Sequence, residues 1–150
     1  MRLTRRAVVT CLASVFLTAG ARAADVASPV PGKRVALRGY DPVAYFTDGH
    51  PVQGDPRFWY EFDDTVYLFA GPEHRAVFVA DPDHYAPIFR GFCAVSIAYG
   101  MKDEGLPDVW RIVDGKLFVF GRPEGPKDFA ADPAGITARA RANWAALPTK

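Results

Sequence analysis

The sequence predicts an α+β fold: a small antiparallel β-sheet with two hairpins, short helices and a C-terminal helix. Two stretches rich in aromatic and β-branched residues are each broken by a two-residue turn, proline and glycine punctuate the segments between them, and an amphipathic segment lies near the end of the chain. Early strands followed by short helices and a terminal helix are typical of the α+β class. No internal repeat or low-complexity tract is apparent.

Turn chemistry predicts the two hairpins. The first joins residues 58–62 to residues 65–69 through Asp63-Asp64. The second joins residues 110–113 to residues 116–120 through Asp114-Gly115, and an Asp-Gly pair between two such runs is one of the strongest short-range hairpin signals. The aromatic and β-branched residues of the four arms fit a pleated, half-buried surface.

Prolines mark the ends of the predicted helices. Pro72 suits the first turn of a helix that Asp81-Pro82 ends, and Pro82 begins a second short helix that Pro87 stops. Residues 135–147 (GITARARANWAAL) are predicted to close the chain as a helix. Its apolar stripe consists of Ile136, Ala140, Trp144 and Leu147.

Residues 1–23 (MRLTRRAVVTCLASVFLTAGARA) have the composition of a cleaved export signal. They combine a basic start, an apolar run from Ala7 to Leu17, and small residues at Ala21 and Ala23. The apolar run is shorter than the roughly 20 residues that span a bilayer, so we expect no stable membrane span after cleavage. Residues 4–9 resemble a twin-arginine signal, with the general secretory route as the alternative. We therefore expect a periplasmic or secreted bacterial protein.

The rest of the chain is predicted to hold a flexible N-terminal arm, residues 24–33, and a single domain, residues 34–150. Removal of the signal takes four arginines and no acidic residue, which changes the formal net charge from +1 to −3. A mildly acidic domain without a basic cluster lacks the electrostatic footprint of a nucleic-acid-binding protein.

Four pieces of the chain resemble the exported, stand-alone branch of the YHS-domain proteins in their order and spacing. They are YDPVAYF, VYLFAGPEHRAVFVADPDHYAP, GFCAVSIAYG and WRIVDGKLFVF. The resemblance covers most of the chain from Leu37 to about Phe120, and a similar helical tail ends in Asn143-Trp144. It implies a role in heavy-metal handling, and copper is the metal most often implied for the family.

The chain departs from the YHS pattern at the cysteines. Metal-associated members read D-P-V-C-G-M, then Y-x-F-C-S-x-x-C, then F and D/N-P-x-x-Y. The first two cysteine positions hold Ala44 and Ala70 here, and the last holds His74. Because alanine supplies no lone pair, the usual thiolate site cannot form. The residues that do match are Asp41-Pro42-Val43, Tyr67, Phe69, Phe78, Asp81-Pro82 and Tyr85.

Four residues remain as candidate metal ligands: His74, His84, Cys93 and Met101. Imidazole, thiolate and thioether together suit copper, and the sulfur ligands favour Cu(I). His74 stands at a family ligand position, with an exposed helix residue as the alternative. His84 is either a ligand or a surface residue, and Met101 is either a soft axial ligand or a packing residue. His50, in a Gly-His-Pro turn, is interpreted as an exposed loop residue.

Cys93 is the cysteine that remains once Cys11 leaves with the signal, so no intrachain disulfide is expected. The resembling branch also carries a cysteine in its G-x-C-A segment, which implies a ligand or redox role. The alternative is an inert core thiol, because free cysteine is among the most buried residue types. Arg90 is the one nearby basic residue that could favour the thiolate.

Sequence motifs give little support to catalysis. Ser96 lacks a G-x-S-x-G setting, and the chain contains no G-x-G-x-x-G, P-loop or H-E-x-x-H motif. The aspartates, including Asp41, fall at turns, where local hydrogen bonding explains them. A hydrolase built from Cys93 and either His74 or His84 is the weakest hypothesis, so we expect a protein that is not an enzyme.

Two function classes stay open at this point. The first is a periplasmic protein that binds or traffics a metal ion, with copper favoured and haem a lesser variant. The second is a metal-free binding module that recognises another periplasmic protein or a small apolar ligand, because a fold can outlast its site. The second class would use an aromatic surface formed by Tyr40, Tyr45, Trp59 and Tyr99.

Overall fold

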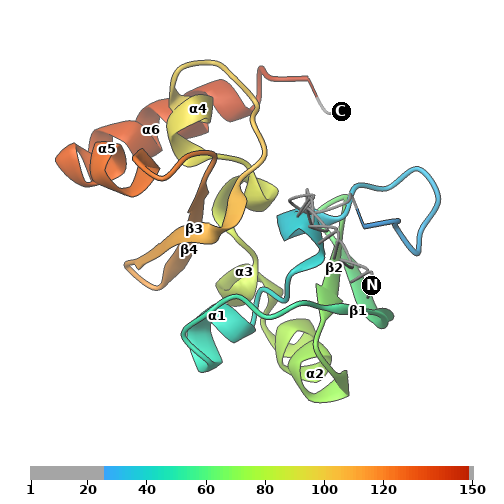
Figure 1. Cartoon of the computed structure of the whole chain (residues 1–150). Helices are drawn as coiled ribbons and strands as arrows, with labels where there is room; N and C mark the ends of the chain where they lie inside the picture. Colours follow the sequence, from blue (N-terminus) through green and yellow to red (C-terminus); the bar gives the residue numbers. More distant parts are fainter. Residues whose placement is uncertain (1–25, 149–150) are drawn as a thin grey trace, which may run out of the picture.

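The computed structural model describes residues 26–148, so the predicted export signal lies outside the described residues. Figure 1 shows two groups of elements, with β1, β2 and α2 at the lower right and β3, β4, α5 and α6 at the left. Within the described range, no helix has the length and apolar character needed to cross a membrane.

The elements follow one another in this order: η1 (Ala36–Gly39), α1 (Ala44–Thr47), β1 (Asp55–Phe62), β2 (Thr65–Phe69), α2 (Pro72–Ala80), α3 (Pro82–Tyr85), η2 (Ile88–Gly91), α4 (Ala94–Ala98), β3 (Leu106–Val113), β4 (Lys116–Phe120), α5 (Gly125–Ala131) and α6 (Pro133–Trp144). The predicted α+β class, both hairpins, helices α2 and α3 and the C-terminal helix are confirmed. Helices α1, α4 and α5 were not predicted, because so few residues cannot show a helical period.

The hairpins form two separate two-stranded sheets rather than the one small sheet that we expected. Each hairpin is antiparallel, and each has a register irregularity at the same place, before Trp59 in β1 and before Trp110 in β3. Both tight turns have left-handed backbone, with φ of 48° at Asp63 and 50° at Asp114. This conformation matches the right-handed twist of the flanking strands, which explains why the two turns were predictable.

The chain contains an internal repeat, which corrects the reading that it has none. A 3₁₀ turn, a short helix, a hairpin and two helices run from η1 to α3 and then again from η2 to α6. The same number of residues separates the aligned positions throughout the hairpin and the helix that follows it. Aligned identities are Gly54 and Gly105, Pro56 and Pro107, Trp59 and Trp110, Phe69 and Phe120, Phe78 and Phe129, and Asp81 and Asp132.

The repeat extends to unusual backbone conformations. Leu37 and Arg38 in η1 have φ of 52° and 53°, and Phe89 and Arg90 in η2 have φ of 58° and 54°. Non-glycine residues in this region cost roughly 1 kcal/mol or more each, so their recurrence at matched positions marks a built feature of the fold. The glycine that ends each turn accepts a hydrogen bond through its carbonyl from the glycine that precedes the hairpin.

Strand β4 lies between the two hydrophobic clusters of the interior. Phe118 and Phe120 pack into the second-half cluster, whereas Leu117 and Val119 pack into the first-half cluster. Successive side chains of a strand point to opposite faces, so one strand can serve both clusters. The two halves are therefore joined through a shared strand as well as through the chain.

The described part of the predicted flexible arm, residues 26–33, lies against the rest of the chain. The ammonium of Lys33 pairs with Asp64 and with Glu61, the latter at 2.9 Å. Val26 lies beside Gly39, where an added Cβ would meet it at 2.9 Å. These residues therefore contact the rest of the chain in the structure, and the flexibility expected of the arm stays a prediction.

Candidate functional site

Asp41 and His74 form a buried carboxylate–imidazole pair in the first half. Asp41 is fully buried between η1 and α1, and His74 lies in the first turn of α2. The carboxylate accepts hydrogen bonds from the backbone N–H of Val43 and of Ala70, both at 2.8 Å, and from Nδ1 of His74 at 2.7 Å. All three donors converge on one side chain, which ties the start of α2 to the loop before α1.

The hydrogen bond between Asp41 and His74 fixes the orientation of the imidazole. A carboxylate that accepts from Nδ1 directs Nε2 outward, as it does for many metal-bound histidines. However, no cluster of three or more histidine, cysteine, aspartate or glutamate side chains suitable for a metal occurs within residues 26–148. The arrangement at His74 is explained by its structural role at Asp41. Sequence reasoning assigned Asp41 to a turn, although its place in the matched D-P-V piece could have drawn attention to it.

The other histidines have separate surroundings. The ring of His84 in α3 packs on Phe46 and Tyr85, with centroid distances of 5.0 and 4.6 Å. Its backbone N–H is bonded to the Asp81 carboxylate that caps the helix. His50 is exposed in its loop, as predicted. Within residues 26–148, neither histidine joins His74 in a group of three or more potential metal ligands.

Cys93 borders a cleft of about 220 Å³ in the second half, together with Ser96, Tyr99, Met101 and Arg122. It precedes helix α4, and its Sγ accepts the backbone N–H of Ser96 at 3.5 Å. The residue is only 2 % exposed, whereas Met101 is 53 % exposed. The structure therefore brings together the two sulfur residues among the four predicted ligands.

Cys93 occupies the place in the second half that Asp41 occupies in the first. Each is the second residue after the glycine that ends its 3₁₀ turn. The N–H of Asp41 bonds to the carbonyl of Val52 and that of Cys93 to the carbonyl of Asp103, both at 2.8 Å. Three donors surround the Asp41 carboxylate, whereas one backbone N–H bonds to the Cys93 thiol. An open cleft lies beside that thiol.

The residue aligned with Ala70 helps to explain why the second half has this open space. It is Gly121, which lines the cleft and has no side chain, whereas Gly125, aligned with His74, packs against Phe120 and does not line the cleft. A Cβ added at Gly121 would lie 3.8 Å from Sγ of Cys93, so this wall of the cleft is backbone.

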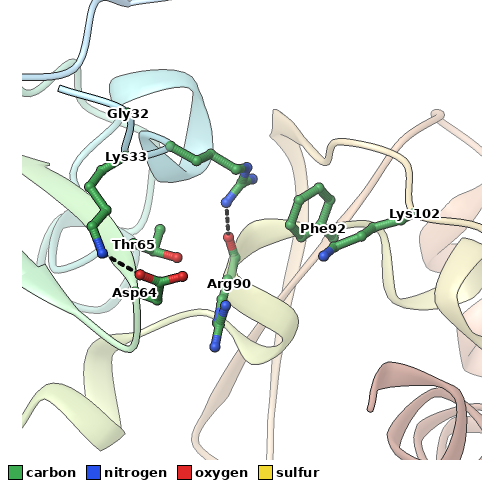
Figure 2. A pocket seen from close by; sticks show the side chains of 8 residues that line it. Gly32, Lys33, Asp64, Thr65, Arg90, Phe92 and Lys102 are labelled. Atoms are coloured by element: carbon green, nitrogen blue, oxygen red, sulfur yellow. Dashed lines mark hydrogen bonds and ion pairs between the residues drawn. The ribbon is translucent and has the colours of Figure 1, made fainter. Parts of the chain in front are cut away.

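A second cleft, of about 230 Å³, lies where the arm meets the first hairpin turn and η2 (Figure 2). Figure 2 shows Lys33 reaching Asp64 on one side and Lys102 beside Phe92 on the other. Most of its cations are already paired. Arg34 makes two hydrogen bonds to the Glu104 carboxylate at 2.6 and 2.5 Å, and Arg90 makes two to Asp63 at 2.9 and 2.8 Å.

Lys102 is the exception in this cleft, because aromatic rings and a carbonyl surround its ammonium. It lies 4.8 Å from the ring centroids of both Phe92 and Trp144 and donates to the carbonyl of Pro148 at 2.8 Å. Desolvation lowers the pKa of Lys102, and the charges of Arg90 and Arg34 lower it further. The cleft is best explained as an ionic and cation–π junction that holds the arm in place.

The predicted aromatic surface does not form as a unit. Tyr45 is buried, its hydroxyl donates to the carbonyl of Pro107 at 3.0 Å, and burial raises the pKa of its phenol. Including Tyr45 in an exposed surface was therefore wrong. Trp59 is 37 % exposed on β1, and Tyr99 is 69 % exposed at the Cys93 cleft, in the other half. Tyr40 is half-buried.

Comparison of the chain with protein-family models, curated proteins and solved structures finds no significant match. The resemblance to YHS-domain proteins therefore rests on the sequence pieces described above.

Proposed function

We propose that the protein is a non-catalytic, exported YHS-type protein that binds a soft heavy-metal ion, copper(I), through Cys93 and Met101. The observation that carries the proposal is the shared cleft of about 220 Å³ that brings a thiol and a thioether to one place. Thiolate and thioether ligands select Cu(I) over harder ions, and Cu(I) is stable with few ligands.

The surroundings of Cys93 suit a thiolate ligand. The backbone N–H of Ser96 already points at Sγ, and the guanidinium of Arg122, which is paired with Asp128 at 2.6 Å, lies in the cleft wall. Met101 is exposed and unbranched, so its thioether can move onto an ion without disturbing the core.

The proposal changes the ligand set expected from the sequence. His74 is held by Asp41, and His84 packs on aromatic rings, both within the first half. No histidine lines the Cys93 cleft, so no imidazole stands ready to deprotonate the thiol as in a cysteine hydrolase. The proposed role is therefore to hold or hand over an ion in the periplasm rather than to catalyse a reaction.

Competition for Cu(I) under anaerobic, reducing conditions tests the proposal. The purified protein is titrated against a chromophoric Cu(I) chelator, and we expect one equivalent of Cu(I) to be withdrawn from it. Cys93→Ser should abolish this competition, and Met101→Leu should weaken the affinity by about tenfold, which corresponds to roughly 1.4 kcal/mol. His84→Ala is the matched control and should retain the wild-type affinity.

Equal Cu(I) affinity in the wild-type protein and in Cys93→Ser would refute the proposal. Loss of binding in His84→Ala, with Cys93→Ser unaffected, would instead place the metal in the first half. Circular dichroism of each variant shows whether a loss of binding reflects a loss of fold.

A further inference from the structure

A groove of about 530 Å³ lies between the second hairpin and helices α5 and α6, the elements grouped at the left of Figure 1. Ile88 and the rings of Phe118 and Phe129 line it, and the two rings lie 4.7 Å apart between centroids. Ala134 and Ala138 of α6 contribute small side chains to its wall. The groove shares no residue with the Cys93 cleft.

The cleft that contains the aligned first-half residues is much smaller, at about 200 Å³, and it adjoins the open groove, because Ile88, Lys116 and Arg141 line both. Larger side chains occupy the aligned positions, since Phe62 aligns with Val113 and Asp83 aligns with Ala134. This smaller cleft is also crossed by the ion pair of Asp63 and Arg90 at 2.8 Å. The two aligned clefts can therefore be compared. Larger side chains at Phe62 and Asp83 narrow the first, and the smaller Val113 and Ala134 leave space in the second.

The ion pair has no counterpart in the open groove. Asp114 aligns with Asp63, and Arg141 follows Pro133 at the spacing at which Arg90 follows Pro82. Among the described residues, the guanidinium of Arg141 makes no ion pair with Asp114 or with any other carboxylate. Lys116, also in the lining, donates to the carbonyl of Asp83 at 2.7 Å and makes no ion pair among the described residues, although Asp63 and Asp83 line the adjoining cleft with it.

The lining therefore combines an apolar interior with two cations and one acid. Pockets of this kind bury an apolar ligand body while a few polar groups fix its orientation. A guanidinium binds a carboxylate through two parallel hydrogen bonds, and a lysine adds a point charge. An uncharged apolar ligand would leave both cations without a partner.

We propose that this groove binds a small amphipathic carboxylate, that is, a carboxylic acid with an apolar chain or ring. The apolar part lies against Phe118 and Phe129, and the carboxylate pairs with Arg141 and Lys116. This site is independent of the copper proposal, because the two sites share no lining residue.

Calorimetric titration of the purified protein with octanoate, and with the uncharged analogue 1-octanol, tests the inference. We expect a single octanoate site, with 1-octanol at least tenfold weaker. Arg141→Gln should weaken octanoate by about tenfold and leave 1-octanol unchanged. Arg139→Gln, on the same helix but outside the lining, is the matched control and should bind octanoate as the wild type does.

Filling the groove provides the second test. Ala138→Phe adds a ring at an exposed position of α6 and should abolish the binding of both ligands, and Ala134→Leu repeats the test from another position. Folding of both variants is checked by their thermal transitions. Octanoate binding that persists in the filled variants, or that Arg141→Gln leaves intact, would overturn the proposal, as would the absence of binding to the wild type. Cys93→Ser should bind octanoate normally, which separates this site from the copper site.

Discussion

The two halves of this protein place different chemistry at the same position of the same fold. In the first half the position holds Asp41, whose carboxylate accepts three hydrogen bonds and is fully enclosed. In the second half it holds Cys93, which receives one N–H and borders a cleft. The difference teaches that a saturated buried group supports the fold, whereas a group with unused bonding capacity beside open space is available for a ligand.

The largest expected effect on stability comes from removing the Asp41 carboxylate, which accepts three hydrogen bonds. Asp41→Ala leaves the N–H groups of Val43 and Ala70 and the imidazole of His74 without their acceptor, and should lower the free energy of unfolding by about 4 kcal/mol. Cys93→Ala removes one buried sulfur and should cost only about 1 kcal/mol. Urea unfolding measures both. Equal losses would mean that the two positions have the same role.

Substitution of the glycines before the hairpins tests whether the two halves are built alike. A Cβ at Gly54 would lie 2.7 Å from the carbonyl oxygen of Gly39, and a Cβ at Gly105 would lie 2.8 Å from that of Gly91. Both distances are too short, so Gly54→Ala and Gly105→Ala should each lower the stability by about 3 kcal/mol.

Gly49→Ala is the control for this pair, because its Cβ would enter open space. Its left-handed φ of 72° should cost about 1 kcal/mol. Thermal unfolding of the three variants gives the comparison. If alanine at either Gly54 or Gly105 left the thermal stability unchanged, the two halves would not be structurally equivalent at this position.

The smallest expected effect concerns a pair that only the first half has. The side chain of Arg57 lowers the pKa of the half-buried Asp55 from its ordinary 3.8 to about 2. The aligned residues are Leu106 and Asp108, which cannot form this pair. Because the folded-state pKa is the lower one, the contribution of the pair to stability is present above about pH 4 and is lost as the pH falls through about 2.

An NMR titration of the Asp55 carboxyl group measures this shift directly. Arg57→Gln should return the pKa of Asp55 toward its ordinary value. A low pKa for Asp55 that persists in Arg57→Gln would assign the shift to another group. The effect on global stability should be small, because the pair is exposed to solvent and salt.

Local features of the structure were readable from the sequence. Asp114-Gly115 predicts its turn because few residues tolerate two successive left-handed conformations, and Pro72 and Pro82 predict helix starts because their backbone angle already suits a first turn. The class, the hairpins and the positions of α2, α3 and α6 follow from such short-range chemistry. The repeat was missed because the aligned identities are scattered over turn and core positions.

Contacts between distant segments could not be read in this way. Asp41 looks like any turn aspartate until α2 brings His74 to it. The Cys93 cleft is completed by Gly121 and Arg122, which follow the second hairpin in the chain, and the open groove depends on how α6 lies against β4.

The sequence by itself determined where the two hairpins turn and where α2 and α3 begin, because those choices depend on the backbone preferences of neighbouring residues. It also determined which side chains are available for chemistry, above all one cysteine outside the predicted signal. Tertiary structure alone decided that Asp41 is enclosed and Cys93 borders a cleft. The physical reason is that burial and hydrogen-bond saturation depend on residues far apart in the chain, and two positions with the same backbone setting received different neighbours.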